Sequence, residues 1–315
     1  MKAICGLFGA SKQAYYKYDD TLLQKRLLQE QIVIDFVTKM RDKDPHLGGV
    51  KLYYMYKKEY ASEETLGRNS FEHVLSSRGL MLRRSTRRVP KTTDSSHGLP
   101  TYPNRVWSLI PLRPNQIWVS DITYIKIWDD VQNGIYHFCY LALLTDVYTK
   151  QILGYAIGES LDTIYPLRAL KMALRTLPDG FDCSTLIHHS DRGVQYASYK
   201  YVETLKRRNI GISMTENGNP KHNAFAERVN NTIKNEFFAN LTFRSIGDVK
   251  RAVAEAVDFY NTQRPHLSLD MHTPNEAACM TGEIRKLWYS YRENAIKSAN
   301  DLVETEKNDT FVPAS

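Results

Sequence analysis

Apolar residues recur at helical spacing through the first ninety or so residues of the chain. From Thr21 to Lys43, leucine, isoleucine and valine return every three or four positions, which predicts an amphipathic helix that ends before Asp44. Shorter helices are predicted from Val50 to Tyr60 and from Ser70 to Arg78. The first part of the chain is therefore expected to be helical.

The last of these helices has residues typical of helix caps at both of its ends. Asn69 and Glu72 have the spacing of a capping box, and Gly79 stands where a helix favours its C-terminal cap. Two short helices around a polar turn are typical of a helix-turn-helix, which enters a DNA groove, but an ordinary helical hairpin fits the pattern equally well.

After about Asn115 the pattern changes to that of strands. β-branched and aromatic runs separated by turn residues predict a three-stranded meander over residues 116–127, 134–147 and 151–159. A helix (161–177), a strand (184–188), a second helix (199–208) and another strand (210–215) are predicted to follow. Further helices are predicted over 223–238 and 246–260. This order predicts an α/β fold.

Charge and composition narrow the possible partners. The chain has 42 Lys and Arg against 35 Asp and Glu, a net charge of +7, which favours nucleic acid. Six cations without an acid fall between residues 78 and 91, where they form either a DNA-binding arm or a solvated tether: Arg78, Arg83, Arg84, Arg87, Arg88 and Lys91.

Other classes of protein are disfavoured. No apolar run approaches the about 20 residues that span a bilayer, and the N-terminus lacks a secretion signal, so we expect a cytoplasmic protein without a membrane partner. The four cysteines lie far apart, which argues against disulfides and structural zinc.

Three acids stand where a purely structural acid is unexpected. Asp121 interrupts a strand of β-forming residues, and Asp191 directly follows a short apolar strand. Glu227 shares one polar helical stripe with Asn223, Asn230 and Lys234. Each acid alone is compatible with a structural role.

Together the three acids can converge on divalent cations, which prefer oxygen ligands. Two Mg²⁺ ions about 3.5–4 Å apart stabilise the attacking and leaving oxygens of phosphoryl transfer, the chemistry of DNA cleavage and joining. Lys234 and the two asparagines would then point toward the DNA phosphates.

At these residues the sequence resembles the DDE transposases and retroviral integrases, and most closely the third insertion-sequence family. The resemblance runs from about Ala14 to Ala277, and 35 residues separate Asp191 from Glu227, the interval typical of the family. The segments that carry it are WVSDITYI, HHSDRGVQYAS, NAFAERVNNTIKNEFF and FYNTQRPHLSLDMHTPNEA.

The resemblance implies a ribonuclease-H-like core with a mixed five-stranded sheet, which depends on Mg²⁺ or Mn²⁺ and uses Asp121, Asp191 and Glu227 as catalytic metal ligands. Asn261, Arg264, Pro265 and His266 match a family signature whose role is DNA contact or a helix stop with a tight turn. The expected divisions are a helix-turn-helix-like region (1–90), a basic linker (91–114), the catalytic core (115–280) and a C-terminal helical extension with a loose tail (281–315).

The implied function is transposition, with cleavage and strand transfer at the terminal inverted repeats of an insertion sequence and at target DNA. The family acts as homo-oligomers on DNA, and members are often fused to an upstream helix-turn-helix protein. This chain lacks the leucine-zipper heptads of that partner and the zinc motif of retroviral integrases. A non-catalytic DNA-binding derivative and a ribonuclease-H-type nuclease remain alternatives.

Overall fold

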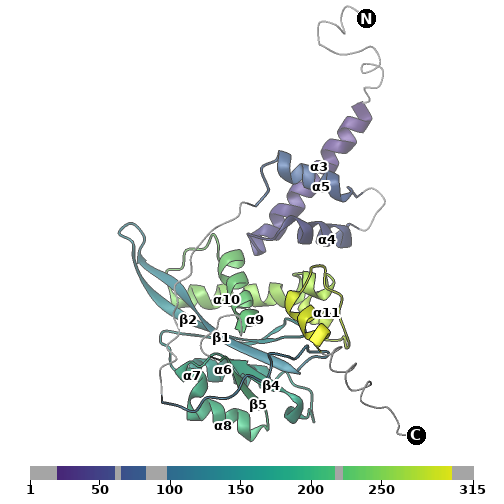
Figure 1. The fold of residues 1–315 in the computed structure, drawn as a ribbon. Coiled ribbons are helices and arrows are strands. Elements are labelled where there is room, and N and C mark those ends of the chain that lie inside the picture. The colour runs from purple at the N-terminus through teal and green to yellow at the C-terminus, as the bar shows by residue number, and fades with distance from the viewer. Residues whose placement is uncertain (1–19, 61–64, 83–97, 217–222, 300–315) are drawn as a thin grey trace, which may run out of the picture. The chain divides into compact units, whose positions relative to one another are not determined.

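The computed structural model describes residues 20–60, 65–82, 98–216 and 223–299 (Figure 1). These residues fall into two compact units. The first contains residues from Met1–Asp42 and Leu47–Ser85, and the second contains residues from Lys43–His46 and Thr86–Ser315. Among the described residues, no helix is both long and apolar enough to cross a membrane.

The first unit contains three helices, α3 (Asp20–Lys43), α4 (Gly49–Glu59) and α5 (Arg68–Ser77). Aromatic rings from all three helices form its core. The ring of Tyr56 lies 5.7 Å from that of Phe36 and 5.2 Å from that of Phe71, measured between centroids. The predicted helices are confirmed, whereas the turn at residues 61–64 and the basic residues Arg83, Arg84, Arg87 and Arg88 lie outside the described residues.

The ends of α5 differ in part from expectation. The predicted capping box is wrong, because the helix begins earlier with Gly67 as its N-cap, and Asn69 lies within the first turn. Glu72 instead accepts a hydrogen bond from Arg68 at 2.8 Å. The C-terminal prediction is confirmed: Gly79 has φ +68°, and the next amide, of Leu80, donates to the carbonyl oxygen of Leu75 at 2.7 Å.

The second unit is built on a five-stranded mixed sheet in the order β3-β2-β1-β4-β5. The strands β1 (Ile117–Asp130), β2 (Ile135–Asp146) and β3 (Ile152–Gly158) form the predicted antiparallel meander. The strands β4 (Ile187–Ser190) and β5 (Gly211–Met214) run parallel to β1. This topology is that of a ribonuclease-H-like core, as expected.

Helices cover both faces of the sheet (Figure 1). The helices α6 (Ile164–Leu174), α7 (Val194–Ala197) and α8 (Tyr199–Arg207) lie on one side, and α9 (Ala224–Thr232) and α10 (Ile246–Thr262) lie on the other. The chain continues through a 3₁₀ turn (Leu267–Leu269) and α11 (Pro274–Ala277), and residues 291–299 are helical.

Several elements are shorter than predicted, among them the helix expected over 161–177, which spans only Ile164–Leu174. The strand expected from residue 184 begins only at Ile187, because Cys183–Thr185 form a 3₁₀ turn in which the Asp182 carboxylate accepts from the amide of Ser184 at 2.9 Å. The helix expected to reach residue 238 changes to a π-helix at Ile233–Phe237. π-Helical turns within α-helices are often found at functional sites.

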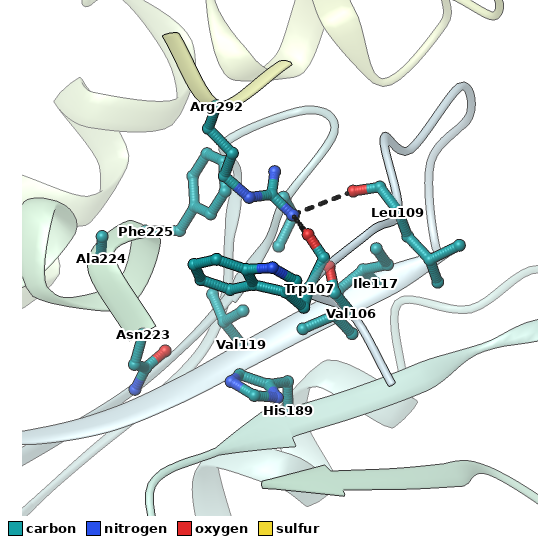
Figure 2. Close-up of a pocket in the computed structure, with 11 residues that line it drawn as sticks. Val106, Trp107, Leu109, Ile117, Val119, His189, Asn223, Ala224, Phe225 and Arg292 are labelled. Carbon is teal, nitrogen blue, oxygen red and sulfur yellow. Dashed lines mark hydrogen bonds between the residues drawn. The ribbon is translucent and has the colours of Figure 1, made fainter. Parts of the chain in front are cut away.

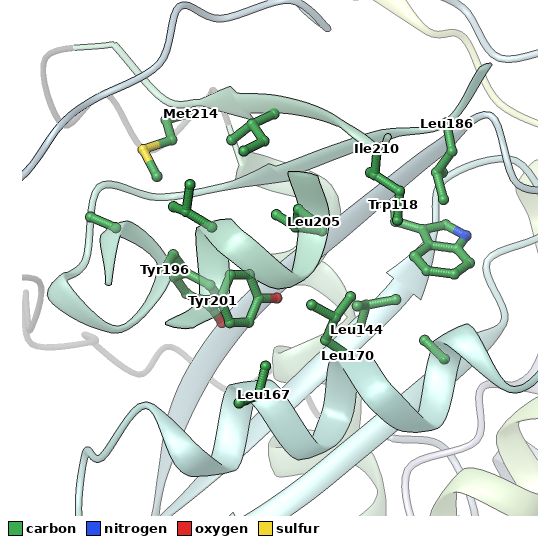
Figure 3. Close-up of a cluster of buried hydrophobic side chains, with 14 of the residues drawn as sticks. Trp118, Leu144, Leu167, Leu170, Leu186, Tyr196, Tyr201, Leu205, Ile210 and Met214 are labelled. Atoms are coloured by element: carbon green, nitrogen blue, oxygen red, sulfur yellow. The ribbon is translucent and has the colours of Figure 1, made fainter. Parts of the chain in front are cut away.

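A hydrophobic cluster between the sheet and α6 to α8 fixes the position of β1 (Figure 3). Trp118 of β1 is fully buried there together with Leu144, Leu170 and Leu205. Because side chains alternate along a strand, the burial of Trp118 determines the face on which Asp121 emerges three residues later.

Candidate active site

Asp121 lies in the interior of β1, opposite Leu143 of β2 in the antiparallel register. Its Oδ2 accepts a hydrogen bond of 2.7 Å from Nδ2 of Asn230 on α9. Burial raises the pKa of Asp121 to about 7, and the negative charges of Asp191 and, more weakly, Glu227 act in the same direction. The three predicted acids therefore share one electrostatic environment.

Asp191 directly follows β4, the strand that lies parallel to β1. Its Oδ1 accepts a hydrogen bond of 3.0 Å from the amide of Gly193. The loop thus orients the carboxylate at the carboxyl end of β4, where open α/β sheets commonly place their sites.

Glu227 lies in the first turn of α9, and burial raises the pKa of this half-buried carboxyl. The predicted polar stripe is present in part: Nδ2 of Asn223 donates to the carbonyl oxygen of Ser120 at 3.1 Å, and Asn230 bonds to Asp121. Lys234 lies in the π-helical turn, where burial lowers its pKa while the Asp121 carboxylate acts in the opposite direction. These polar residues of α9 and of the π-turn therefore face the end of the sheet that carries the aspartates.

The residues at this end of the sheet have the donor chemistry of a divalent-cation site. Besides the carboxylates, the Oδ1 atoms of Asn223 and Asn230 are buried and have no hydrogen-bond partner in the described part of the chain. Within the same described ranges, no three His, Cys, Asp or Glu side chains lie at metal-ligand spacing. Oxygen-rich residues with unused acceptors fit a hydrated hard cation, provided that the carboxylates rotate inward to meet it.

A buried histidine supports the strands beneath the carboxylates. Nε2 of His188 lies 2.9 Å from the Ser120 hydroxyl and 2.9 Å from the Tyr201 hydroxyl. These two hydrogen bonds join β4 to β1 and to α8. Burial lowers the pKa of His188 to about 3, so the ring is neutral at physiological pH. The sequence analysis missed this role, although a polar pair inside an apolar strand was a signal.

The family signature after α10 lies in the interior. The Asn261 side chain bonds both the amide and the carbonyl of Ile152 on β3, each at 2.9 Å. The guanidinium of Arg264 is 3% exposed and forms ion pairs with Glu236 and with Asp44, a residue of the same unit. His266 is also buried. For this signature, the geometry favours the helix-stop alternative over DNA contact.

A small cavity of about 50 Å³ lies beside the first turn of α9 (Figure 2). His189 and Asn223 line it near the carboxylates, and Trp107, Phe225 and Arg292 line it on the other side. This volume holds at most a few water molecules and is too small for a nucleotide.

Comparison with known proteins gives the following relationships. Two sequence families described as integrase core domains match residues 111–220 and 208–274. The uncharacterized 31 kDa protein of insertion element IS600 from Shigella sonnei is 32% identical over 279 residues, which cover 86% of this chain and 96% of that protein.

The putative transposase of insertion sequence IS986/IS6110 from Mycobacterium tuberculosis (strain CDC 1551 / Oshkosh) is 36% identical over 157 residues, which cover 49% of this chain. The match spans about half of that transposase, 54% of its length. Among solved structures, the catalytic core domain of HTLV-2 integrase in complex with magnesium aligns with a TM-score of 0.40 and 18% identity, covering 54% of this chain and 99% of that one.

Proposed function

Because this chain belongs to the insertion-sequence transposases that carry an integrase core domain, we propose that Asp121, Asp191 and Glu227 catalyse metal-dependent cleavage and strand transfer at the ends of such an element. Integrase cores are polynucleotidyl transferases that use divalent metal ions. The finer assignment, to these three residues and to this pair of reactions, is our proposal.

The observation that carries the proposal is that Asp191 and Glu227 lie close enough to Asp121 to raise its pKa. Asp121 comes from a central strand, Asp191 from the end of the neighbouring strand and Glu227 from a helix on the sheet, yet both of the latter raise the pKa of Asp121. Like charges brought together destabilise a fold, so their grouping favours a role in function.

The three carboxylates would hold two divalent ions, either Mg²⁺ or Mn²⁺. The ions would activate the attacking oxygen and stabilise the charge of the leaving oxygen. In cleavage, a water oxygen attacks the phosphorus and the DNA 3′ oxygen leaves. In joining, that 3′-hydroxyl attacks the phosphorus of a second phosphodiester, whose own 3′ oxygen leaves and takes up a proton, so no covalent bond to a side chain is required.

The surrounding residues have supporting roles in this proposal. Asn230 orients the Asp121 carboxylate, and Asn223 ties the start of α9 to β1. The ammonium of Lys234 would contact the phosphate next to the cleaved bond. The partners would be the terminal inverted repeats and target DNA, bound by a homo-oligomer in the cytoplasm, with an upstream helix-turn-helix protein as a further candidate partner.

The test is a strand-transfer assay with labelled DNA that carries the element's ends, in Mg²⁺, Mn²⁺ or EDTA. We expect joined products with either metal and none in EDTA, and no joining by Asp191→Asn despite an unchanged circular dichroism spectrum. Glu203→Gln, an exposed acid on α8 paired with Arg207, is the matched control and should join DNA normally.

The alternatives give other outcomes in the same assay. Hydrolysis without joining would identify a nuclease, and binding without any product would identify a non-catalytic DNA-binding derivative. Full activity of the Asp191→Asn variant would contradict the assignment of the catalytic residues.

A further inference from the structure

The segment from Arg285 to Arg292, which we call the strap, places aromatic residues between basic ones. Its sequence, RKLWYSYR, contains three cations, three aromatic residues and no acid. The strap lies beyond residue 274, where the matched integrase core families end. Basic and aromatic residues in combination are typical of surfaces that bind single-stranded nucleic acid.

The strap is anchored at both ends to the second unit. The amide of Leu287 donates to the carbonyl oxygen of Leu267 at 2.8 Å. The guanidinium of Arg292 lies 6.0 Å from the ring of Phe225 on α9, and it donates to three carbonyl oxygens at 2.8, 2.8 and 3.2 Å, those of Val106, Trp107 and Leu109 (Figure 2). Arg292 therefore fixes the strap and is not itself available to a ligand.

Anchoring leaves the aromatic rings of the strap in solvent. Trp288 is 42% exposed, Tyr289 is 65% exposed and Tyr291 is 82% exposed. The last two rings pack edge to face with their centroids 4.8 Å apart. A single exposed aromatic residue is ordinary, but three within four positions on an anchored backbone form a stacking surface.

Positive charge surrounds this surface and extends toward the catalytic carboxylates. The guanidinium carbon of Arg228 lies 5.7 Å from the centroid of the Trp288 ring, and Arg228 directly follows Glu227 on α9. The Trp288 ring therefore lies next to the helix that carries the catalytic glutamate.

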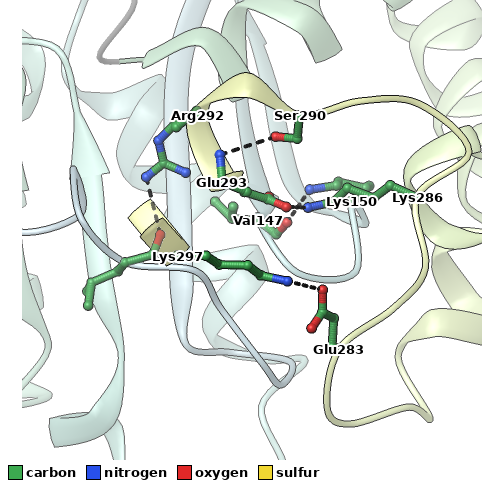
Figure 4. Close-up of polar contacts among 9 residues, drawn as sticks. Val147, Lys150, Glu283, Lys286, Ser290, Arg292, Glu293 and Lys297 are labelled. Atoms are coloured by element: carbon green, nitrogen blue, oxygen red, sulfur yellow. Dashed lines mark hydrogen bonds and ion pairs between the residues drawn. The ribbon is translucent and has the colours of Figure 1, made fainter. Parts of the chain in front are cut away.

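The cations in and around the strap that Figure 4 labels outnumber the acids labelled with them. Glu293 pairs with Lys286, and Glu283 pairs with Lys297. Burial lowers the pKa of Lys286 to about 8 and that of Lys150 to about 7, and the two ammonium groups repel one another. A bound anion would relieve this repulsion, which favours a polyanionic ligand over an apolar protein partner.

We propose that the strap and Arg228 bind unpaired nucleotides of the DNA strand that leads to the catalytic carboxylates. The bases stack on Trp288, Tyr289 and Tyr291, while Arg228 and Arg285 contact the phosphates. Stacking requires exposed base faces, which neighbouring base pairs cover in a duplex, so the ligand is single-stranded. The inference rests on the proposed function, since it assumes that this chain acts on DNA.

The test measures binding of the full chain to fluorescent oligothymidylate and to a blunt duplex of equal length, both in EDTA so that no catalysis occurs. Trp288→Ala and Tyr291→Ala should each weaken oligothymidylate binding about tenfold and leave duplex binding unchanged. Tyr199→Ala removes an equally exposed ring, 78% accessible on α8, and should bind like the wild type.

Unchanged oligothymidylate binding in both strap variants would overturn the inference, as would an equal loss for the duplex or for the Tyr199 variant. If sedimentation velocity showed that Trp288→Ala dissociates an oligomer while oligothymidylate binding stays normal, the strap would be a contact between copies and the inference would fail. Asp191→Asn should bind oligothymidylate normally in EDTA, so a failure of the catalytic proposal is distinguishable from a failure of this one.

Discussion

Asn230 donates a hydrogen bond of 2.7 Å to the Asp121 carboxylate across 109 positions of sequence. The bond connects α9, which carries Glu227, to the central strand, and the negative charge of Glu227 raises the pKa of Asp121. It also lowers the pKa of Asp121, against the effect of burial. One amide therefore orients the carboxylate and favours its charged form, the form that the proposed metal binding requires.

Removal of this amide is expected to impair catalysis more than folding. Asn230→Ala should slow strand transfer by about 10- to 100-fold, as is typical when a partner that orients a metal ligand is lost. Asn231→Ala changes the neighbouring, exposed asparagine and serves as the control. Strand-transfer rates in Mg²⁺ measure the effect on catalysis, and melting temperatures measure the effect on folding. Equal strand-transfer rates for the two variants would contradict the role of Asn230.

Asp121→Asn is expected to stabilise the protein while it abolishes activity. The folded pKa of about 7 lies above the ordinary value of 3.8, so the carboxyl reduces stability progressively as pH rises through this range and fully above pH 7. At pH 8 in EDTA, the variant should gain on the order of 1–3 kcal/mol of unfolding free energy. At pH 4 the gain should disappear. Urea unfolding at both pH values measures it, and a loss of stability at pH 8 would argue against repulsion among the acids.

His188 is expected to make the fold sensitive to acid. Its folded pKa of about 3 lies below the ordinary value of 6.5, so between these values the unfolded chain binds a proton that the folded chain does not. Stability is therefore lost as pH falls below 6.5, with a contribution of up to about 1.4 kcal/mol per pH unit from this ring. His188→Gln should flatten this dependence in unfolding titrations, and an unchanged pH dependence in that variant would contradict the role of the ring.

Arg264 is expected to be essential for folding. Arg264→Ala leaves Glu236 and Asp44 without their cation, and loss of one partner from a buried ion pair costs about 3–5 kcal/mol. Arg264→Lys retains the charge and should recover part of the stability. Thermal unfolding and DNA affinity are measured together. If the lysine variant lost DNA affinity at an unchanged melting temperature, Arg264 would instead be a DNA contact.

Gly154 allows β3 to lie against α6. A Cβ atom at this position would be 2.0 Å from the carbonyl oxygen of Ala169, an atom of the helix backbone that cannot move aside. Gly154→Ala should therefore lower the unfolding free energy by about 2–4 kcal/mol. Gly247→Ala, where the nearest atom is a side-chain oxygen at 3.4 Å, should be tolerated. Similar melting temperatures for the two variants would show that β3 and α6 can separate without cost.

The sequence alone predicted the candidate acids because their oddity is local. Asp121 is unusual inside a β-forming run, and Glu227 shares a helical face with Asn223 and Asn230, which can be counted along the chain. What the chain could not show is which partner each side chain meets. The bond between Asn230 and Asp121 depends on how α9 packs on the sheet.

The sequence by itself determined the order of helices and strands, the three acids and the basic character of the chain, since periodicity and side-chain chemistry are properties of neighbouring residues. Only the tertiary structure decided that Arg264 is an interior ion-pair partner and that His188 joins β4 to β1. It also decided that the strap presents Trp288 beside Arg228. These facts depend on contacts between residues far apart in sequence, and only the packed sheet and helices bring such residues together.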